Sequence, residues 1–238
     1  MGYGSTPNFH SEVFMKLLED LYNRCLNAPY IHTENDGDYF YEIKKDILYL
    51  YFQCTHGGDD WKNNLDFPAV PYSDMGIKWK CHRGFLLVWE SIKPCLKDVV
   101  MDKNIKGVYI IGYSHGAAIA TLAHEYVWFN RPDLRGNMKG FGFGCPRCYW
   151  GFKVKKSLKE RWENFYPIRN INDLVTHVPP VIFGFMHVNK VIQLENADLK
   201  KEYKKIPSID AHYMVNYQYS LEKEKDHKDF YINGVNYD

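Results

Sequence analysis

Ser114 stands between two glycines, in the segment formed by residues 112–116 (Gly-Tyr-Ser-His-Gly). A serine hydroxyl is a weak nucleophile, and it attacks an acyl carbon only where a neighbouring base can take its proton. A sharp turn with small flanking residues can present such a serine, because side chains at the glycine positions would crowd the turn or the packing beneath it. The segment therefore predicts a nucleophile at Ser114, with an ordinary serine-containing turn as the simpler alternative.

The residues on either side of this turn supply the elements that such a site requires. Residues 108–111 are apolar and mostly β-branched, which predicts a strand, and residues 117–123 are rich in alanine, which favours a helix. The start of a helix directs its first N–H groups and the positive end of its dipole at the serine. The backbone N–H of His115 is therefore a predicted donor to the oxyanion that forms during acyl transfer.

A carboxylate must follow the serine in the chain, because α/β enzymes of this kind run in the order serine, acid, histidine. Asp173 is the leading candidate, since it directly follows a predicted strand and so lies at the carboxyl edge of the sheet, where ligands bind. Asp198 and Asp210 have the character of surface loop residues.

A histidine base must in turn follow the acid. His212 follows a loop and precedes an apolar, helix-like run. Four other histidines lie downstream of the serine, and each has a feature against it. In chain order, the first lies within the predicted helix that follows Ser114, the second is very close in sequence to Asp173, the third is embedded in a strand pattern, and the fourth falls in a charged tail. They are His124, His177, His187 and His227.

The composition is that of an ordinary folded protein. The 238 residues are 45% hydrophobic and 25% charged, with a formal net charge of +1, so nothing indicates nucleic acid as a partner. The sequence has no apolar run long enough to cross a bilayer, and residues 1–14 lack the basic and apolar regions of a signal peptide. A cytoplasmic location is therefore expected.

Two further patterns are weaker signals. Cys145 and Cys148 form an isolated CxxC, and without a second pair it is poor evidence for a metal or redox site. Met1-Gly2 fits the permissive pattern for N-myristoylation, but a plain, loosely held terminus is the simpler explanation. No metal or cofactor is needed for the predicted serine chemistry.

The order of the predicted elements gives the fold class. Strands that alternate with helices favour an α/β fold with a mainly parallel central sheet flanked by helices. Without repeats or linkers, residues 1–238 are expected to form one domain, with 222–238 as a loosely held tail. Besides the strand and helix around Ser114, we expect helices at 11–27, 84–103 and 154–164, strands at 39–43 (an edge strand), 46–54, 138–144 and 165–171, a strand or hairpin at 183–194, and a loop at 55–75.

At this point the chain resembles a known family, the class 3 lipases, which are the fungal-lipase-like branch of the α/β hydrolases. The likeness extends over roughly residues 47–215 in one colinear order, and several motifs in register are far more specific than any one of them. The segments that match the family's motifs are 52–55, 61–67, 82–85, 112–123, 143–147 and 172–180. The fifth segment covers the first three residues of the CxxC, which gives that pattern an explanation without metal or redox chemistry.

The resemblance implies an α/β-hydrolase fold and assigns roles to residues. It makes Ser114 the nucleophile, Asp173 the acid and His212 the base. It also implies an oxyanion hole formed by the backbone N–H groups of Thr55 and His115. The expected activity is hydrolysis of an acyl ester or lipid through an acyl-enzyme, without a cofactor.

The family's lid corresponds to residues 57–65, which are polar apart from Trp61 and Leu65. A lid that opens on a lipid surface should carry a broad apolar face. We therefore expect weak interfacial activation, and a short-to-medium acyl ester or dispersed lipid as substrate.

Two alternatives stay open. The first is a phospholipase or lysophospholipase in peripheral contact with membranes, with the basic residues in 153–159 as a surface patch, although a solvated face also explains them. The second is a catalytically silent lipid-binding protein on the same fold, since fold alone never proves function. An intact set of Ser114, Asp173 and His212 argues against the second.

Overall fold

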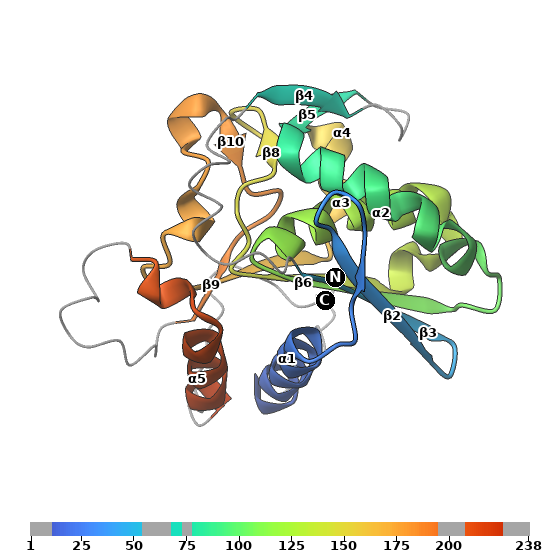
Figure 1. Ribbon diagram of the computed structural model, residues 1–238, viewed down its shortest axis with the longest axis horizontal. Helices are drawn as coiled ribbons and strands as arrows, with labels where there is room; N and C mark the ends of the chain where they lie inside the picture. The colour runs from blue at the N-terminus through green and yellow to red at the C-terminus, as the bar shows by residue number, and fades with distance from the viewer. Residues whose placement is uncertain (1–10, 54–67, 73–77, 195–207, 226–238) are drawn as a thin grey trace, which may run out of the picture.

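The computed structural model describes residues 11–53, 68–72, 78–194 and 208–225. Its largest feature is a seven-stranded sheet in the order β1-β2-β3-β6-β7-β9-β11 (Figure 1). Neighbouring strands from β3 to β11 pair in parallel, whereas β1, β2 and β3 pair antiparallel at one side. The strands are β1 (Ile31–His32), β2 (Asp38–Lys44), β3 (Ile47–Gln53), β6 (Gly107–Tyr113), β7 (Met138–Phe143), β9 (Phe165–Asn170) and β11 (Ile192–Leu194).

Helices lie on both faces of this sheet, as a mainly parallel sheet requires. One face is covered by α2 (Arg83–Met101) and α3 (His115–Asn130). The other face is covered by α1 (Ser11–Leu26) and α5 (Met214–Lys225), which lie side by side (Figure 1). The predicted α/β class with a mainly parallel sheet is confirmed, whereas the single-domain organisation stays a prediction.

The central strand β6 is buried on both faces. Val108 and Ile110 pack on the side of α2 and α3, and Ile111 and Tyr113 pack on the side of α1 and α5. A strand covered on both sides consists of an almost continuous apolar run rather than an alternating one. This burial explains the apolar sequence that precedes Ser114.

The neighbouring strand β7 alternates glycine with phenylalanine because α3 lies very close to it. A Cβ on Gly140 would lie 2.8 Å from Nδ1 of His124 in α3 and 2.3 Å from Cδ2 of Phe165 in β9, and a Cβ on Gly142 would lie 3.3 Å from the Cβ of Ala117 in α3. The tightly packed central strand predicted for residues 138–144 is therefore confirmed, and α3 rests directly on the sheet behind Ser114.

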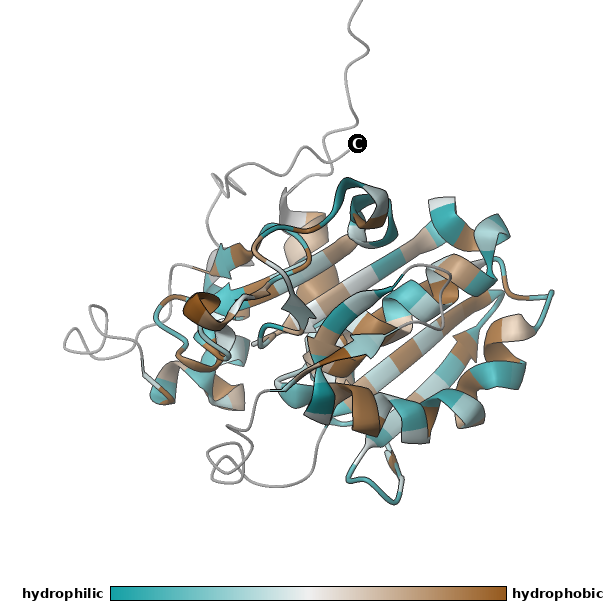
Figure 2. Ribbon diagram, turned by 90° about the horizontal axis from the view of Figure 1, so that it is seen from above, coloured by the Kyte–Doolittle hydropathy of each residue, from teal (hydrophilic) through white to brown (hydrophobic). Residues whose placement is uncertain are grey.

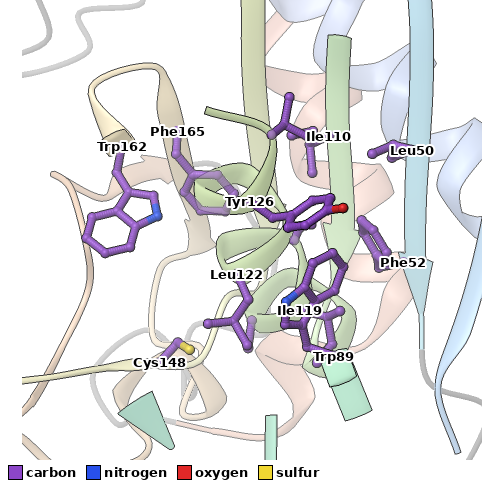
Figure 3. Packing of buried hydrophobic residues seen from close by; sticks show 14 of the residues in the cluster. Leu50, Phe52, Trp89, Ile110, Ile119, Leu122, Tyr126, Cys148, Trp162 and Phe165 are labelled. Carbon is purple, nitrogen blue, oxygen red and sulfur yellow. The ribbon is translucent and has the colours of Figure 1, made fainter. Parts of the chain in front are cut away.

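Aromatic side chains fill the space between α2, α3 and the sheet (Figure 3). The ring of Trp89 in α2 lies 6.3 Å from the ring of Phe52 in β3 and 5.6 Å from the ring of Tyr126 in α3. Its Nε1 donates a hydrogen bond to the hydroxyl group of Tyr72 at 3.1 Å. This core packs α2 and α3 together against the sheet.

A second, smaller sheet lies above α2 and α3 in Figure 1. Its four antiparallel strands have the order β10-β8-β5-β4, and each contains only two to four residues. They come from distant parts of the chain, and none is long enough to show the alternation of apolar and polar residues that marks a strand. The sequence therefore gave no sign of this sheet. The strands are β4 (Ala69–Tyr72), β5 (Trp79–His82), β8 (Tyr149–Trp150) and β10 (Phe185–Met186).

Three predicted elements are wrong because of this sheet or its connections. The loop predicted at 55–75 contains β4, although residues 54–67 and 73–77 lie outside the described part. The strand or hairpin at 183–194 is two short strands of different sheets, β10 and β11. The helix predicted at 154–164 is one helical turn, α4 (Lys156–Lys159), followed by a 3₁₀ turn, Glu160–Trp162. That short turn suffices to bury Leu158 and Trp162 before β9 begins.

Two smaller differences concern the predicted edge strand and the predicted C-terminal tail. The strand predicted at 39–43 is β2, which does not form the edge of the sheet because β1 pairs with it. Of the tail predicted at 222–238, residues 222–225 belong to α5 instead, and residues 226–238 lie outside the described part of the chain. Within the described part of the chain, no helix combines the length and the apolar character that a membrane span needs.

Candidate active site

Ser114 lies in the turn between β6 and α3, in a backbone conformation that few residues adopt. Its φ is 55° and its ψ is −126°, the kind of strain that is found where a strand-to-helix turn presents a nucleophile. A Cβ on Gly112 would lie 2.2 Å from the carbonyl oxygen of Gly116, and a Cβ on Gly116 would lie 2.1 Å from that of Phe52. The crowding predicted at both glycine positions is confirmed.

The imidazole ring of His212 lies directly beside this serine. Its Nε2 is 2.7 Å from Oγ of Ser114, and its Nδ1 is 2.9 Å from Oδ2 of Asp173. His212 ends a short 3₁₀ turn, Asp210–His212, that precedes α5. The fold thus brings together the three residues that the resemblance assigns to the triad, although they are far apart in the chain.

Asp173 is fully buried in the loop that follows β9. Its Oδ1 accepts a hydrogen bond from the N–H of Val175 at 2.9 Å, which leaves Oδ2 turned to the histidine. Two backbone hydrogen bonds tie the loop to Ser208, one from its N–H to the carbonyl of Asn172 and one to its carbonyl from the N–H of Leu174. The carboxylate is therefore held in a single orientation from several sides.

Two tyrosines that no sequence motif singled out complete the site. Tyr217, fully buried in α5, donates to Oδ2 of Asp173 at 2.5 Å and accepts from the N–H of Asn170 at 3.0 Å. Burial, followed by the charge of Asp173, raises the pKa of Tyr217 well above its ordinary value, so its hydroxyl remains a donor. Tyr113 donates to the carbonyl of His212, and the two rings stack with centroids 5.3 Å apart.

Only one of these tyrosines carries a signal in the sequence. Tyr113 directly precedes the nucleophile, so its position could have marked it. Tyr217 lies at the end of the apolar run that follows His212, but this run does not indicate its role, which depends on a contact with a residue 44 positions away.

The other described histidines make structural contacts instead. His177 donates from Nδ1 to the carbonyl of Asp173 at 2.9 Å, and His187 donates from Nε2 to the carbonyl of Thr176 at 2.9 Å. His124 is buried in α3, where burial lowers its pKa to about 3. Of the described bases left open by the sequence, His212 is therefore the one placed at Ser114.

Of the remaining candidates, Asp210 is the one that the structure describes. Asp210 accepts a hydrogen bond at its backbone carbonyl from the side chain of Asn216. Asp198 and His227 lie outside the described residues, as do the lid residues Trp61 and Leu65. In the part of the chain that the structure describes, no group of three or more histidine, cysteine, aspartate or glutamate side chains is arranged to hold a metal ion.

The CxxC segment has a structural role. Cys145 and Cys148 are buried free thiols, and burial raises the pKa of Cys145 to about 12, which leaves it protonated and unreactive. Arg147 between them donates from Nη1 to the carbonyls of His177 and Pro179, at 2.5 and 3.0 Å. The segment thus anchors the chain that follows Asp173.

The two predicted oxyanion donors have different outcomes. Thr55 lies outside the described residues. His115 is the first residue of α3, so its N–H is the first amide of the helix and lies beside the nucleophile. Its imidazole ring packs 4.9 Å from the ring of Phe85, and burial, followed by the charge of His82, lowers its pKa to about 4. Next to Ser114 the ring is therefore neutral at physiological pH.

Comparison with known proteins agrees with this geometry. Residues 49–183 match the family described as lipase (class 3). The chain belongs to the class 3 lipase family. The α/β-hydrolase fold expected from the resemblance is confirmed by solved fungal lipases. Lipase from Rhizopus microsporus var. chinensis has a TM-score of 0.65 at 18% identity, and the match covers 88% of each chain. Lipase II from Rhizopus niveus has a TM-score of 0.64 at 19% identity, covering 88% of this chain and 96% of that one.

Curated relatives of this class 3 lipase chain include secreted enzymes of fungi. Secreted mono- and diacylglycerol lipase 1 of Fusarium solani is 28% identical over 154 residues, which is 60% of this chain and 43% of the relative. Lipase of Rhizomucor miehei is 26% identical over 154 residues, which is 60% of this chain and 40% of the relative. The chain thus spans about two fifths of the length of these relatives.

Proposed function

We propose that this chain is a serine-dependent carboxylic ester hydrolase that acts on acyl or lipid esters through an acyl-enzyme. The observation that carries the proposal is the hydrogen-bonded series in which Nε2 of His212 contacts Oγ of Ser114 and Nδ1 contacts Asp173. The strained backbone of Ser114 and membership of the class 3 lipase family support it.

In the first half of the reaction, Ser114 attacks the carbonyl carbon of the ester while His212 takes its proton. Asp173 keeps the imidazole in the tautomer that carries a proton on Nδ1, and it stabilises the imidazolium ion that forms. The N–H of His115, together with that of Thr55, binds the oxygen that becomes negative. His212 then returns the proton to the leaving alcohol, and the acyl group stays on Ser114.

In the second half, water replaces the alcohol. His212 removes a proton from the water as it attacks the acyl carbon, and the same N–H donors bind the second tetrahedral oxyanion. Collapse releases the carboxylic acid and returns the proton to Ser114. Each step uses side chains that already stand in contact in the free protein.

For the substrate, we propose a short-to-medium acyl ester or a dispersed lipid. The support is the polar sequence of residues 57–65, where the apolar side chains are Trp61 and Leu65. The names of the Fusarium and related enzymes, mono- and diacylglycerol lipases, make partial glycerides the first natural substrates to try.

The test is a panel of soluble esters of increasing acyl length, dispersed diacylglycerol and a triglyceride emulsion. We expect turnover of the first two classes, and a fall in kcat/KM of roughly 10⁴-fold or more in the Ser114→Ala and Asp173→Asn variants. A clear preference for long-chain emulsions would contradict the substrate class. A folded protein that hydrolyses nothing on the panel would favour the silent lipid-binding alternative.

A phospholipase acting at membranes is the second candidate. Residues 153, 155, 156 and 159 are exposed lysines close to the small sheet, and they favour an anionic surface as a partner. Release of fatty acid from phospholipid vesicles at a higher rate than from dispersed diacylglycerol would select this candidate over the first.

A further inference from the structure

Four large apolar side chains are exposed together beside the small sheet. The exposed fractions are 74% for Phe152, 46% for Val181, 81% for Ile182 and 56% for Phe183. We call this group the apolar rim. In Figure 2 the turn formed by Val181–Phe183 is the dark brown coil toward the left, on the side that faces the viewer. Clustered exposed side chains of this size mark interaction sites more often than single ones do.

The two parts of the rim lie side by side because β8 and β10 pair. Phe185 opposes Trp150 in an antiparallel ladder, and the pairing continues past it, since the N–H of Gly151 donates to the carbonyl of Gly184 at 2.7 Å. The next residue of each segment is a rim phenylalanine, Phe152 on one strand and Phe183 on the other.

The turn that carries three of the rim residues is well fixed. The indole Nε1 of Trp150 donates to the carbonyl of Phe183 at 2.9 Å, and the N–H of Gly184 donates to the carbonyl of Val181 at 2.8 Å. Gly184 has a φ of 86°, which a residue with a side chain rarely adopts. The rim is therefore displayed by a preorganised turn, and its exposure needs no opening movement.

Lysine side chains lie beside the rim. The stretches that contain the small sheet, residues 68–72, 78–89, 134–159 and 174–194, contain no aspartate or glutamate. Lys80 lies with its Nζ 4.7 Å from the ring of Trp150, beside the rim, and Lys153 follows Phe152 directly and is exposed. The whole chain carries a net charge of only +1, so this basic character is local.

A series of ring contacts joins the rim's strand to the nucleophile. The ring of Phe185 lies 5.8 Å from that of His82, which stacks on Phe85 at 4.3 Å. Phe85 lies 4.9 Å from the ring of His115, the residue after Ser114. The rim and the candidate active site are therefore two ends of one packed layer.

We propose that the apolar rim inserts into the surface of an anionic lipid layer while the neighbouring lysines bind its head groups. An amphipathic surface of apolar side chains bordered by lysines is suited to the boundary between head groups and acyl chains. As a docking surface for a hydrolase of lipid esters, the inference rests on the proposed function. Binding itself, however, is measurable without turnover.

The experiment measures co-sedimentation of the protein with vesicles of phosphatidylcholine, with and without phosphatidylserine. We expect tighter binding when phosphatidylserine is present, and weaker binding at high salt. Ile182→Ser should weaken binding about tenfold, because the variant lacks the favourable free energy of moving an apolar side chain of this size from water into the lipid layer. Lys153→Gln should weaken it about fivefold, and only on vesicles that contain phosphatidylserine.

A matched control is Val13→Ser, since Val13 is 60% exposed on α1 at the opposite face of the large sheet and should not affect binding. Ser114→Ala should bind vesicles like the wild type, so that failure of hydrolysis and failure of binding are separate results. Equal binding of Ile182→Ser and the wild type would overturn the proposal, as would no binding by either. Self-association lost in Ile182→Ser without vesicle binding would also overturn it, and would make a second copy of the chain the occupant.

Discussion

Tyr217 and His212 donate hydrogen bonds to the same oxygen of Asp173, at 2.5 Å from the phenol and 2.9 Å from Nδ1 of the imidazole. Both donors come from the segment that begins with the 3₁₀ turn at residues 210–212 and continues as α5. Besides helping to cover one face of the sheet, α5 therefore also positions the carboxylate of Asp173 that orients His212. Tyr217 touches no substrate, and we describe it as a positioning residue.

Tyr217→Phe removes the hydroxyl from this arrangement and keeps the ring. We expect kcat to fall about tenfold while KM changes little, because a hydrogen bond to a charged group contributes roughly 1.5–3 kcal/mol. We also expect the free energy of unfolding to fall by about 1–3 kcal/mol, since the N–H of Asn170 loses its acceptor. Steady-state kinetics and urea denaturation measure the two effects.

Tyr219→Phe is the control for this change, because it makes the same substitution in the same helix at a half-buried position. Its kinetics should match the wild type. A Tyr217→Phe enzyme that loses stability but keeps its full kcat would limit Tyr217 to a structural role.

Gly116→Ala should destabilise the protein severely. The added Cβ would lie 2.1 Å from the backbone carbonyl oxygen of Phe52, and a backbone atom in the central sheet cannot move aside as a flexible side chain can. We expect a loss of at least about 3 kcal/mol in the free energy of unfolding, or failure to fold. Gly136→Ala is the matched substitution, because a Cβ there meets nothing within 4 Å. Similar unfolding midpoints for the two variants would contradict this account of the turn.

His124 should make the protein less stable as the pH falls. Burial lowers its pKa from 6.5 to about 3 in the folded state, whereas the unfolded chain binds a proton below about pH 6.5. The unfolded state therefore holds more protons between these values, and the free energy of unfolding decreases as the pH falls through this range. From pH 6.5 to pH 5, the loss from this one group is about 2 kcal/mol.

The comparison with His124→Gln isolates this contribution, since glutamine does not titrate and every other group is shared. Urea denaturation at neutral pH and at about pH 5 should show a smaller loss of stability in the variant than in the wild type. Equal losses in the two proteins would show that His124 does not account for the pH dependence.

The sequence predicted the large sheet well where local signals were strong. Residues 108–111 and 46–54 are apolar runs of strand length, and the glycines at 112 and 116 mark a turn that tolerates no side chain. The triad residues followed from chain order and from family motifs. These signals are local or colinear, so a single sequence contains them.

The small sheet and the tyrosines behind the triad depend on contacts between distant segments. β8 contains two residues, and its pairing with β5 and β10 becomes visible only when the chain is folded. Residues 154–164 have helical composition, but the nearby start of β9 and the burial of Trp162 restrict the helix to one turn. Tertiary packing decides such short elements, and local propensity does not.

The most direct test of the proposed function is covalent labelling by a fluorophosphonate probe, with the modified residue located by peptide mass spectrometry. An activated serine predicts one labelled peptide that contains Ser114, no labelling in Ser114→Ala, and unchanged labelling in Ser157→Ala, where an exposed serine is removed instead. The experiment is run with and without detergent, so that the probe can also reach Ser114 if part of the protein covers the site in water. A folded protein that stays unlabelled in both conditions, or labelling that persists in Ser114→Ala, would contradict the proposal that Ser114 is the nucleophile.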